Sequence, residues 1–233
     1  MIKRIFSFLL LIGFIYVFFI IVSNIEDKTA LTGVGKQYVE RSSEKELGAM
    51  NIVTAIIVTY RGLDTLGEVA VLFIAATGIA VLLRRKKKPI ANANKRKSSE
   101  ILITGSRLLV PIMIMFGVYI FLNGHLSPGG GFQGGAVIAS AIMLLFLADT
   151  EYSINHKVFG WIESLSGFLY IFVGVLGIYL LGNSNFLDNR FLPLGEFGSI
   201  LSAGAIPVIY TLIGLKVGTE LASIIDNMRG ELE

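Results

Sequence analysis

Long apolar runs alternate with short polar segments along the 233 residues of the chain. A hydrocarbon core about 30 Å thick is crossed by roughly 20 helical residues, and most of the runs approach or exceed that length. The runs are residues 5–22, 66–83, 101–122, 136–148, 158–181 and 198–225. The pattern predicts an all-α membrane protein with about six transmembrane helices. A shorter apolar run at 50–60 predicts an interfacial helix followed by a turn.

The composition supports a membrane protein and excludes several kinds of site. Hydrophobic residues make up 54% and charged residues 16% of the chain, and the mean hydropathy is +0.72, which is too apolar for an ordinary soluble domain. The chain has no cysteine, so disulfides and thiolate metal sites are excluded, and two histidines, His125 and His156, leave little for a zinc or haem site. We therefore expect no bound metal or cofactor and no catalytic centre in this chain.

Basic residues beside the apolar runs predict the orientation. Lys3 and Arg4 precede the first run, residues 84–88 follow the second, and residues 95–97 continue this basic block. Positive charge beside a span favours the cytoplasmic side, so we expect both termini in the cytoplasm and a multi-pass protein of the cell membrane. A nucleic-acid-binding role for the block is the weaker interpretation, because a membrane chain does not require one.

The basic block also predicts a boundary within the chain. Residues 89–99 contain Asn and Ser between two apolar halves and are predicted to form a linker. The linker separates a two-span segment, residues 1–88, from a four-span segment, residues 100–233. Residues 5–22 are interpreted as a retained anchor rather than a cleaved signal peptide, because the run is long and no small-x-small cleavage site follows.

A glycine-rich segment, residues 124–135, lies between the third and fourth runs and is predicted to be a turn. Its candidate residues are His125, Pro128, Gly129, Gly130, Gly131, Phe132, Gly134 and Gly135. Irregular backbone is costly in lipid, so the turn is expected at a membrane surface or in a protein-lined cavity. Its glycines suit a carbonyl-lined cation contact or close packing against a neighbouring subunit, and we favour packing. His125 can titrate near neutral pH and so pass or sense protons, although a lone histidine in a surface turn usually does neither.

Acidic residues precede the second and last runs. Arg61, Asp64 and Glu68 would share one face of a continuous helix. A carboxylate at the start of a span is a functional hypothesis, because ionised groups are expensive there. In the alternative interpretation Gly67 and Glu68 open a helix that Asp64 or Thr65 caps, and capping would also explain residues 194–196, Leu-Gly-Glu.

Ionisable residues also fall inside the later runs. Lys216 and Glu220 are four residues apart on the last run, and Glu163 on the fifth run is close in depth to Arg107 on the third. We expect these four residues to form one buried polar cluster, which can be static or part of a proton or cation relay. Pro207 is expected to kink the last run.

The motifs resemble a known family. Residues 124–135, Gly-His-Leu-Ser-Pro-Gly-Gly-Gly-Phe-Gln-Gly-Gly, together with residues 192–196, resemble the B subunits (MnhB/MrpB) of the Mrp-type multisubunit Na+/H+ antiporters over about residues 100–226. Residues 60–68 resemble the C-terminal part of the large A subunit, which is a separate small subunit in membrane-bound hydrogenases. The chain therefore resembles a fusion of two neighbouring Mrp-type pieces.

The resemblance implies an all-helical subunit of a large membrane complex that exchanges Na+ for H+. Such modules also occur in energy-converting hydrogenases and related sulfur-reducing complexes. The implied partners are other Mrp-type subunits, joined in those complexes by hydrogenase or other redox subunits, with no nucleic acid. The resemblance makes Asp64 and Glu68 acidic positions of the A-type piece, with Glu68 a candidate for ion translocation, and makes His125 and residues 128–135 part of the B-type signature.

Two functional hypotheses follow. In the first, the chain is a transporter subunit that forms part of a Na+ path, with candidate residues Glu68, Asp64, Glu163, Lys216, Glu220 and Arg107. In the second, the chain is a structural scaffold whose small residues only pack neighbouring subunits. A stand-alone enzyme is the least favoured, because no nucleophile–base pair is visible. The linker would also let the two halves dock on different neighbours.

Overall fold

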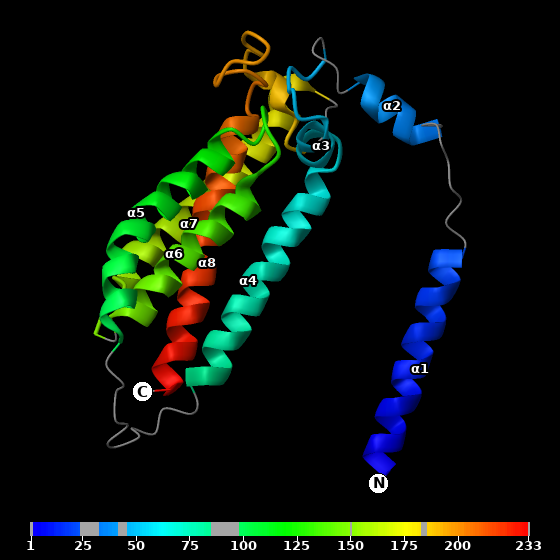
Figure 1. Cartoon of the computed structure of the whole chain (residues 1–233). Coiled ribbons are helices and arrows are strands. Elements are labelled where there is room, and N and C mark those ends of the chain that lie inside the picture. The colour runs from blue at the N-terminus through cyan, green and yellow to red at the C-terminus, as the bar shows by residue number, and fades with distance from the viewer. Residues whose placement is uncertain are drawn as a thin grey trace. The chain divides into compact units, whose positions relative to one another are not determined.

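The computed structural model describes residues 2–23, 33–41, 46–84, 98–149, 151–182 and 186–232, and these residues contain helices and no strand (Figure 1). The elements are α1 (Ile2–Ser23), α2 (Gly33–Arg41), α3 (Ile52–Ala55), the π-helical η1 (Ile56–Tyr60), α4 (Gly62–Arg84), α5 (Glu100–Leu122), α6 (Gly131–Ala148), α7 (His156–Leu181), the 3-10 turn η2 (Asn189–Phe191) and α8 (Ile206–Leu232). The chain divides into two compact units, Met1–Tyr38 and Val39–Glu233. The basic residues 85–88 and 95–97 and most of the predicted linker lie outside the described residues.

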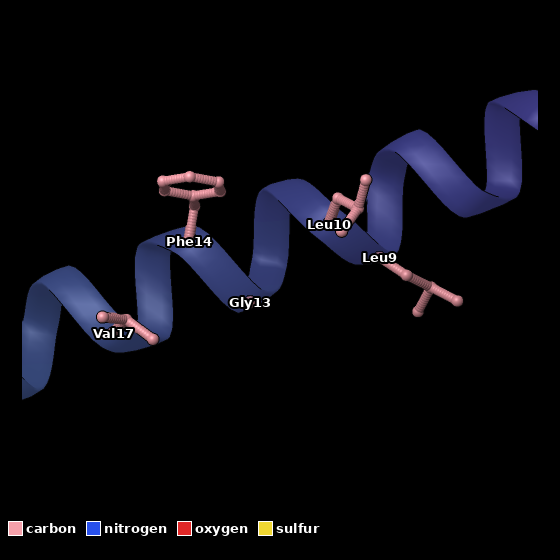
Figure 2. Close-up of a pocket in the computed structure, with 5 residues that line it drawn as sticks. All are labelled: Leu9, Leu10, Gly13, Phe14 and Val17. Atoms are coloured by element: carbon pink, nitrogen blue, oxygen red, sulfur yellow. The ribbon is translucent and has the colours of Figure 1, made fainter.

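The first unit consists of α1 and most of α2. Residues Phe8–Ile20 of α1 form an apolar helical stretch, and large apolar side chains are exposed around it. Figure 2 shows Leu9 and Phe14 projecting to opposite sides of α1, with Gly13 between Leu10 and Phe14. A helix that is apolar all round requires lipid or protein on every side. This helix coincides with the first predicted run.

Five described helices of the second unit are long and apolar enough to cross a membrane: Gly62–Leu83, Glu100–Leu122, Gly131–Ala148, His156–Leu181 and Ile206–Arg229. Together with the apolar stretch of α1 they confirm the prediction of an all-helical membrane protein. The central helix is α8, which packs against α4, α5, α6 and α7. Its buried apolar residues, such as Ile209, Ile213 and Val217, contribute more to the core than those of any other described helix.

The connections gather at the two ends of the α4–α8 bundle (Figure 1). One end carries the segments 46–61, 123–130 and 186–205, which we call the cap. At the opposite end the Ser98 hydroxyl donates to the Leu147 carbonyl over 2.7 Å, and His156 Nε2 lies 3.3 Å from Asp226 Oδ2. Successive helices from α4 to α8 run in alternating directions, in agreement with the predicted order of crossings. Which end of the bundle lies in the cytoplasm stays a prediction.

The glycine-rich segment is only partly a turn, because α6 begins at Gly131. A Cβ at Gly131 would lie 2.6 Å from the Ile213 side chain, one at Gly134 would collide with the Gly117 carbonyl, and one at Gly135 would lie 2.8 Å from the Gly214 carbonyl oxygen. The glycines therefore let α6 approach α5 and α8 closely. Close packing at these glycines therefore occurs within this chain, and packing of the turn against a neighbouring subunit stays a prediction.

The last run begins later than predicted. Residues 198–205 belong to the cap, where Gly198, Ala203 and Gly204 have positive φ, and α8 begins only at Ile206. Pro207 is thus in the first turn of α8, where its missing N–H costs no helical hydrogen bond. The predicted kink is wrong for this reason.

The start of α4 also differs from the prediction. The helix begins at Gly62, so Glu68 lies in its second turn, and the Thr65 hydroxyl donates to the Ile57 carbonyl over 3.0 Å instead of capping α4. Residues 194–196 lie in the cap, well before α8. Thr65 therefore does not cap α4 and residues 194–196 do not cap α8, whereas Asp64 lies in the first turn of α4, where a negative charge is favourable. The run 50–60, predicted to be interfacial, is held in the cap with Ala55 and Val58 fully buried.

Candidate functional site

Side chains of residues 51–54 hold the glycine turn from the first part of the chain. Asn51 donates from Nδ2 to the carbonyls of Gly124 and Ser127 over 2.9 Å each. The Thr54 hydroxyl donates to the same Gly124 carbonyl over 2.7 Å and accepts from the Tyr210 hydroxyl over 3.2 Å. These bonds satisfy turn carbonyls that lipid could not satisfy.

A second buried amide ties the first part of the chain to the loop before α8. Asn189 donates to the carbonyls of Leu47 and Ala203 over 3.0 and 2.9 Å, and its Oδ1 accepts from the Thr59 hydroxyl over 3.0 Å. Residues 46–84 and the later helices therefore form one packed body.

His125 is fully buried in the cap. Its Nε2 lies 3.2 Å from the Ser199 carbonyl oxygen. Because a carbonyl only accepts, Nε2 carries the proton of the neutral ring, and Nδ1 has no hydrogen-bond partner among the described residues. Burial lowers the pKa of His125. The neutral ring therefore joins the glycine turn to the loop 186–205, and this environment does not favour titration near neutral pH.

The most buried charged pair lies inside the helical bundle. Lys216 Nζ donates to Glu220 Oε1 over 2.5 Å, and the two residues are only 8% and 1% exposed. The ammonium also lies 5.1 Å from the centre of the Phe73 ring on α4. A Cβ at Gly167 on α7 would lie 3.6 Å from Nζ. Lys216 thus reaches a point where α4, α7 and α8 meet.

A cavity of about 300 Å³ opens between these three helices. It is lined by Leu66, Val69, Ala70, Phe73, Glu163, Ser164, Gly167, Phe168, Tyr170, Ile171 and Lys216. The Tyr170 hydroxyl and Glu220 Oε2 are buried and have no hydrogen-bond partner among the described residues. Glu163 lies within electrostatic reach of Glu220. Buried polar atoms without partners are costly, so the cavity is a place where a ligand or water would be stabilised.

The other predicted residues lie outside the pair. Glu68 is exposed on α4, within electrostatic reach of the Tyr170 and Tyr210 hydroxyls. Asp64 accepts from Arg61 Nε over 2.6 Å in an ion pair that is more than half exposed. Arg107 is exposed on α5, which packs against α6 and α8. The structure thus brings Glu163, Lys216 and Glu220 together and leaves Arg107 apart.

The comparisons with known proteins agree with the motifs. A family model described as a domain related to the MnhB subunit of Na+/H+ antiporters matches residues 101–223, more than half of the chain. The chain belongs to this family. A second family model, described as the E subunit of MBH, matches residues 6–99. The MnhB-type identity predicted from the sequence is confirmed, and the additional N-terminal piece that we predicted coincides with the match to the E subunit of MBH.

The relatives of this MnhB family member include chains of known complexes. An uncharacterized protein of Methanocaldococcus jannaschii is 33% identical over 190 residues, covering 72% of each chain. The B subunit of the Na+/H+ antiporter of Bacillus subtilis is 34% identical over 102 residues, covering 42% of this chain and 70% of its own.

Two solved structures contain a similar fold. A chain of the membrane-bound sulfane sulfur reductase, an archaeal respiratory membrane complex, superposes with a TM-score of 0.80 at 44% identity over 98% of both chains. A chain of the Mrp complex from a Dietzia species has a TM-score of 0.76 at 21% identity, covering 98% of this chain and 26% of that one. The protein is thus an antiporter-type membrane subunit with the fold of chains from multisubunit complexes.

Sequence reasoning about this MnhB family member found Glu163 and Lys216 but not the other residues that line the cavity, among them Phe73, Gly167 and Tyr170. Phe73, Gly167 and Tyr170 resemble ordinary residues of apolar helices, and no charge distinguishes them. A usable signal was the seven-residue spacing of His156, Glu163 and Tyr170, which places them along one face of α7.

Proposed function

We propose that the chain contributes part of an ion path in an Mrp-type Na+/H+ antiporter module, along the contact of α4, α7 and α8. The observation that carries the proposal is the Lys216–Glu220 pair, which is buried within a helix of membrane-spanning length beside a cavity that Glu163 also lines. Ionised groups inside a membrane are expensive and mark ion paths or relays.

Glu68 and Asp64 extend this path toward the cap end of α4. Glu68 directly precedes Val69 of the cavity wall, with Phe73 five residues further along α4, and an exposed carboxylate in a span requires water or a polar partner. We propose that Glu68 meets a neighbouring Mrp-type subunit and passes ions between that subunit and the cavity. Asp64 with Arg61 lies nearer the helix start, where it can attract cations. We assign Arg107 no place in this path, because it lies on α5 away from the cavity.

The scaffold hypothesis explains other parts of the molecule. The glycines of α6 and the cap hydrogen bonds account for packing without any transport role. They do not account for the buried Lys216–Glu220 pair, whose lysine lines a cavity together with Glu163. Redox subunits are further proposed partners, because the sulfane sulfur reductase that contains a similar chain is a respiratory complex.

The test replaces the buried pair as a unit. The double variant Lys216→Met with Glu220→Gln removes both charges together, which avoids leaving one charge buried without its partner. We expect the intact complex to assemble, as judged by co-purification through a tag on this chain, and to lose Na+/H+ antiport in proteoliposomes. The matched control is Lys157→Met, because Lys157 is exposed at the start of α7. Normal antiport by the double variant would refute the proposed path.

A further inference from the structure

The charged groups around the cavity indicate which of the two antiported ions, Na+ or H+, uses it. We infer that the α4–α7–α8 cavity handles protons and excludes Na+, with Lys216 as the group that releases and regains the proton. This inference rests on the proposed function, because it names the ion that uses the same path. It follows from the oxygen atoms around the cavity, the position of the ammonium group and the charge balance.

The side chains around the cavity do not form a Na+ site. A hard cation in a protein is held by several oxygen atoms that converge on it. The lining side chains that carry oxygen are Glu163, Ser164 and Tyr170, all on α7. Glu163 and Tyr170 are seven residues apart, which is about 10 Å along the helix, so their oxygens do not meet around one ion. The Lys216 ammonium at the same cavity would also repel Na+.

The same groups are suited to a proton. Lys216 faces Glu220 on its own helix, Glu163 and Tyr170 on α7, and α4, where Glu68 lies toward the cap. One ammonium and the two carboxylates of Glu163 and Glu220 carry a formal charge of minus one, and a single added proton neutralises it. The cavity of about 300 Å³ is lined mostly by apolar side chains, and the Lys216 ammonium, the Glu163 carboxylate and the Tyr170 hydroxyl are the polar groups that would hold connecting water molecules.

The transfer step can be written with its atoms balanced. An N–H bond of Lys216 breaks, and an O–H bond forms on the Glu163 carboxylate through intervening water. The products are a neutral amine and a neutral carboxylic acid, and Glu220 keeps its charge, so the total charge is unchanged. The O–H bond of Glu163 then breaks as its proton leaves toward the His156 end of α7, and the amine regains a proton from the aqueous phase on the other side of the cavity, which restores the starting charges. Gly167 leaves space for this movement, because it places no Cβ against the lysine side chain.

A route to water lies at the end of the bundle away from the cap. His156 begins α7 on the same face as Glu163, is well exposed, and contacts Asp226 of α8 over 3.3 Å. An imidazole beside a carboxylate exchanges protons readily with water. The groups His156, Glu163, Lys216 and Tyr170 therefore succeed one another from this end toward Glu68.

The decisive variant is Lys216→Arg in the intact complex. Arginine keeps the positive charge and the pairing with Glu220, but it does not give up its proton in proteins. We expect the turnover of antiport in proteoliposomes to fall about a hundredfold, in the range of a lost acid–base group. We expect the KM for Na+ to stay within about twofold, because no Na+ ligand has been removed. The matched control, Lys157→Arg, is expected to behave as the wild type.

If the Lys216→Arg complex does not assemble, a second variant still tests the inference. Glu163→Gln keeps the shape of the side chain but removes the proton acceptor, with Glu100→Gln on the exposed start of α5 as its control. We expect Glu163→Gln to lower the turnover and to flatten its dependence on pH, again without raising the KM for Na+.

Four results would overturn the inference. Wild-type turnover by the assembled Lys216→Arg complex would show that Lys216 does not release its proton. An unchanged turnover and pH profile in Glu163→Gln would show that Glu163 is not the proton acceptor. A KM for Na+ raised about tenfold at normal turnover would make the cavity a Na+ site, and the proposed function would then survive the failure of this inference. Normal antiport by the neutral double variant would instead refute both.

Discussion

The helices α4 and α8 both have the length and composition of membrane spans, yet their surroundings are opposite. In the most apolar part of each helix, 6% of the residues are buried inside the protein for α4 and 61% for α8. The more buried helix is the less apolar of the two, which reverses the rule for soluble proteins. Lipid solvates apolar side chains well, so α8 uses the interior to hold Lys216, Glu220 and small residues, whereas α4 offers its apolar side chains outward.

Because α8 is buried and α4 is exposed, Glu220 on α8 and Glu68 on α4 have different roles in stability. Glu220 is a buried partner of Lys216, so its charge is part of the folded structure. Glu68 is exposed on α4, so its charge contributes little to the stability of this chain alone. Its proposed partner is a neighbouring subunit. A charge inside the bundle should therefore affect both folding and transport, and a charge on α4 should affect transport alone.

Breaking the buried pair tests this comparison most strongly. Lys216→Ala leaves the Glu220 carboxylate buried without a cation, and we expect the free energy of unfolding to fall by about 3–5 kcal/mol. The neutral double variant should lose much less, so the two changes should be strongly non-additive. Thermal unfolding of the detergent-solubilised protein would measure both. Equal losses for the single and double variants would contradict this expectation.

A pair of glycine substitutions compares the inside and the outside of the bundle. Gly135→Leu places a side chain against the backbone of Gly214 and Gly218 on α8, and we expect a loss of about 1–3 kcal/mol. Gly78→Leu on α4 meets no atom within 4 Å of its Cβ and serves as the control. The midpoints of thermal unfolding of the two variants would measure the difference. A Gly78→Leu variant that is as unstable as Gly135→Leu would show that α4 is not exposed.

The smallest effect on stability is expected at Glu68. Glu68→Gln should change the free energy of unfolding of the chain by less than about 0.5 kcal/mol, because the side chain is exposed. The same variant in the assembled complex should lose Na+/H+ antiport, measured as Na+-driven change of internal pH in proteoliposomes. A large loss of stability without a loss of antiport would reverse the assignment of Glu68.

The order of the helices could be predicted from the apolar runs, and the Lys216–Glu220 pair from its four-residue spacing. The prediction that Arg107 joins the polar cluster was wrong. The position of a residue along its run gives its depth in the membrane but not the side of the helix on which it lies. The start of α6 was missed because glycine favours turns in isolation, whereas contacts with Gly117 and Gly214 stabilise a helix through Gly131–Gly135. The burial of residues 52–60 depends on Asn51, Thr54 and Asn189, whose partners are distant carbonyls that no local pattern reveals.

The hydrogen bonds of the cap cross the boundary between the two matched family segments. Asn51, Thr54 and Thr59 come from the segment similar to the E subunit of MBH, and Gly124, Asn189 and Tyr210 come from the MnhB-related segment. Were these segments separate polypeptides, each would have to find the other by diffusion in the bilayer. Covalent connection instead holds them at an effective concentration of the order of millimolar. Each copy of the chain therefore arrives at its complex with these two segments already matched one to one, independently of the amounts of the other subunits.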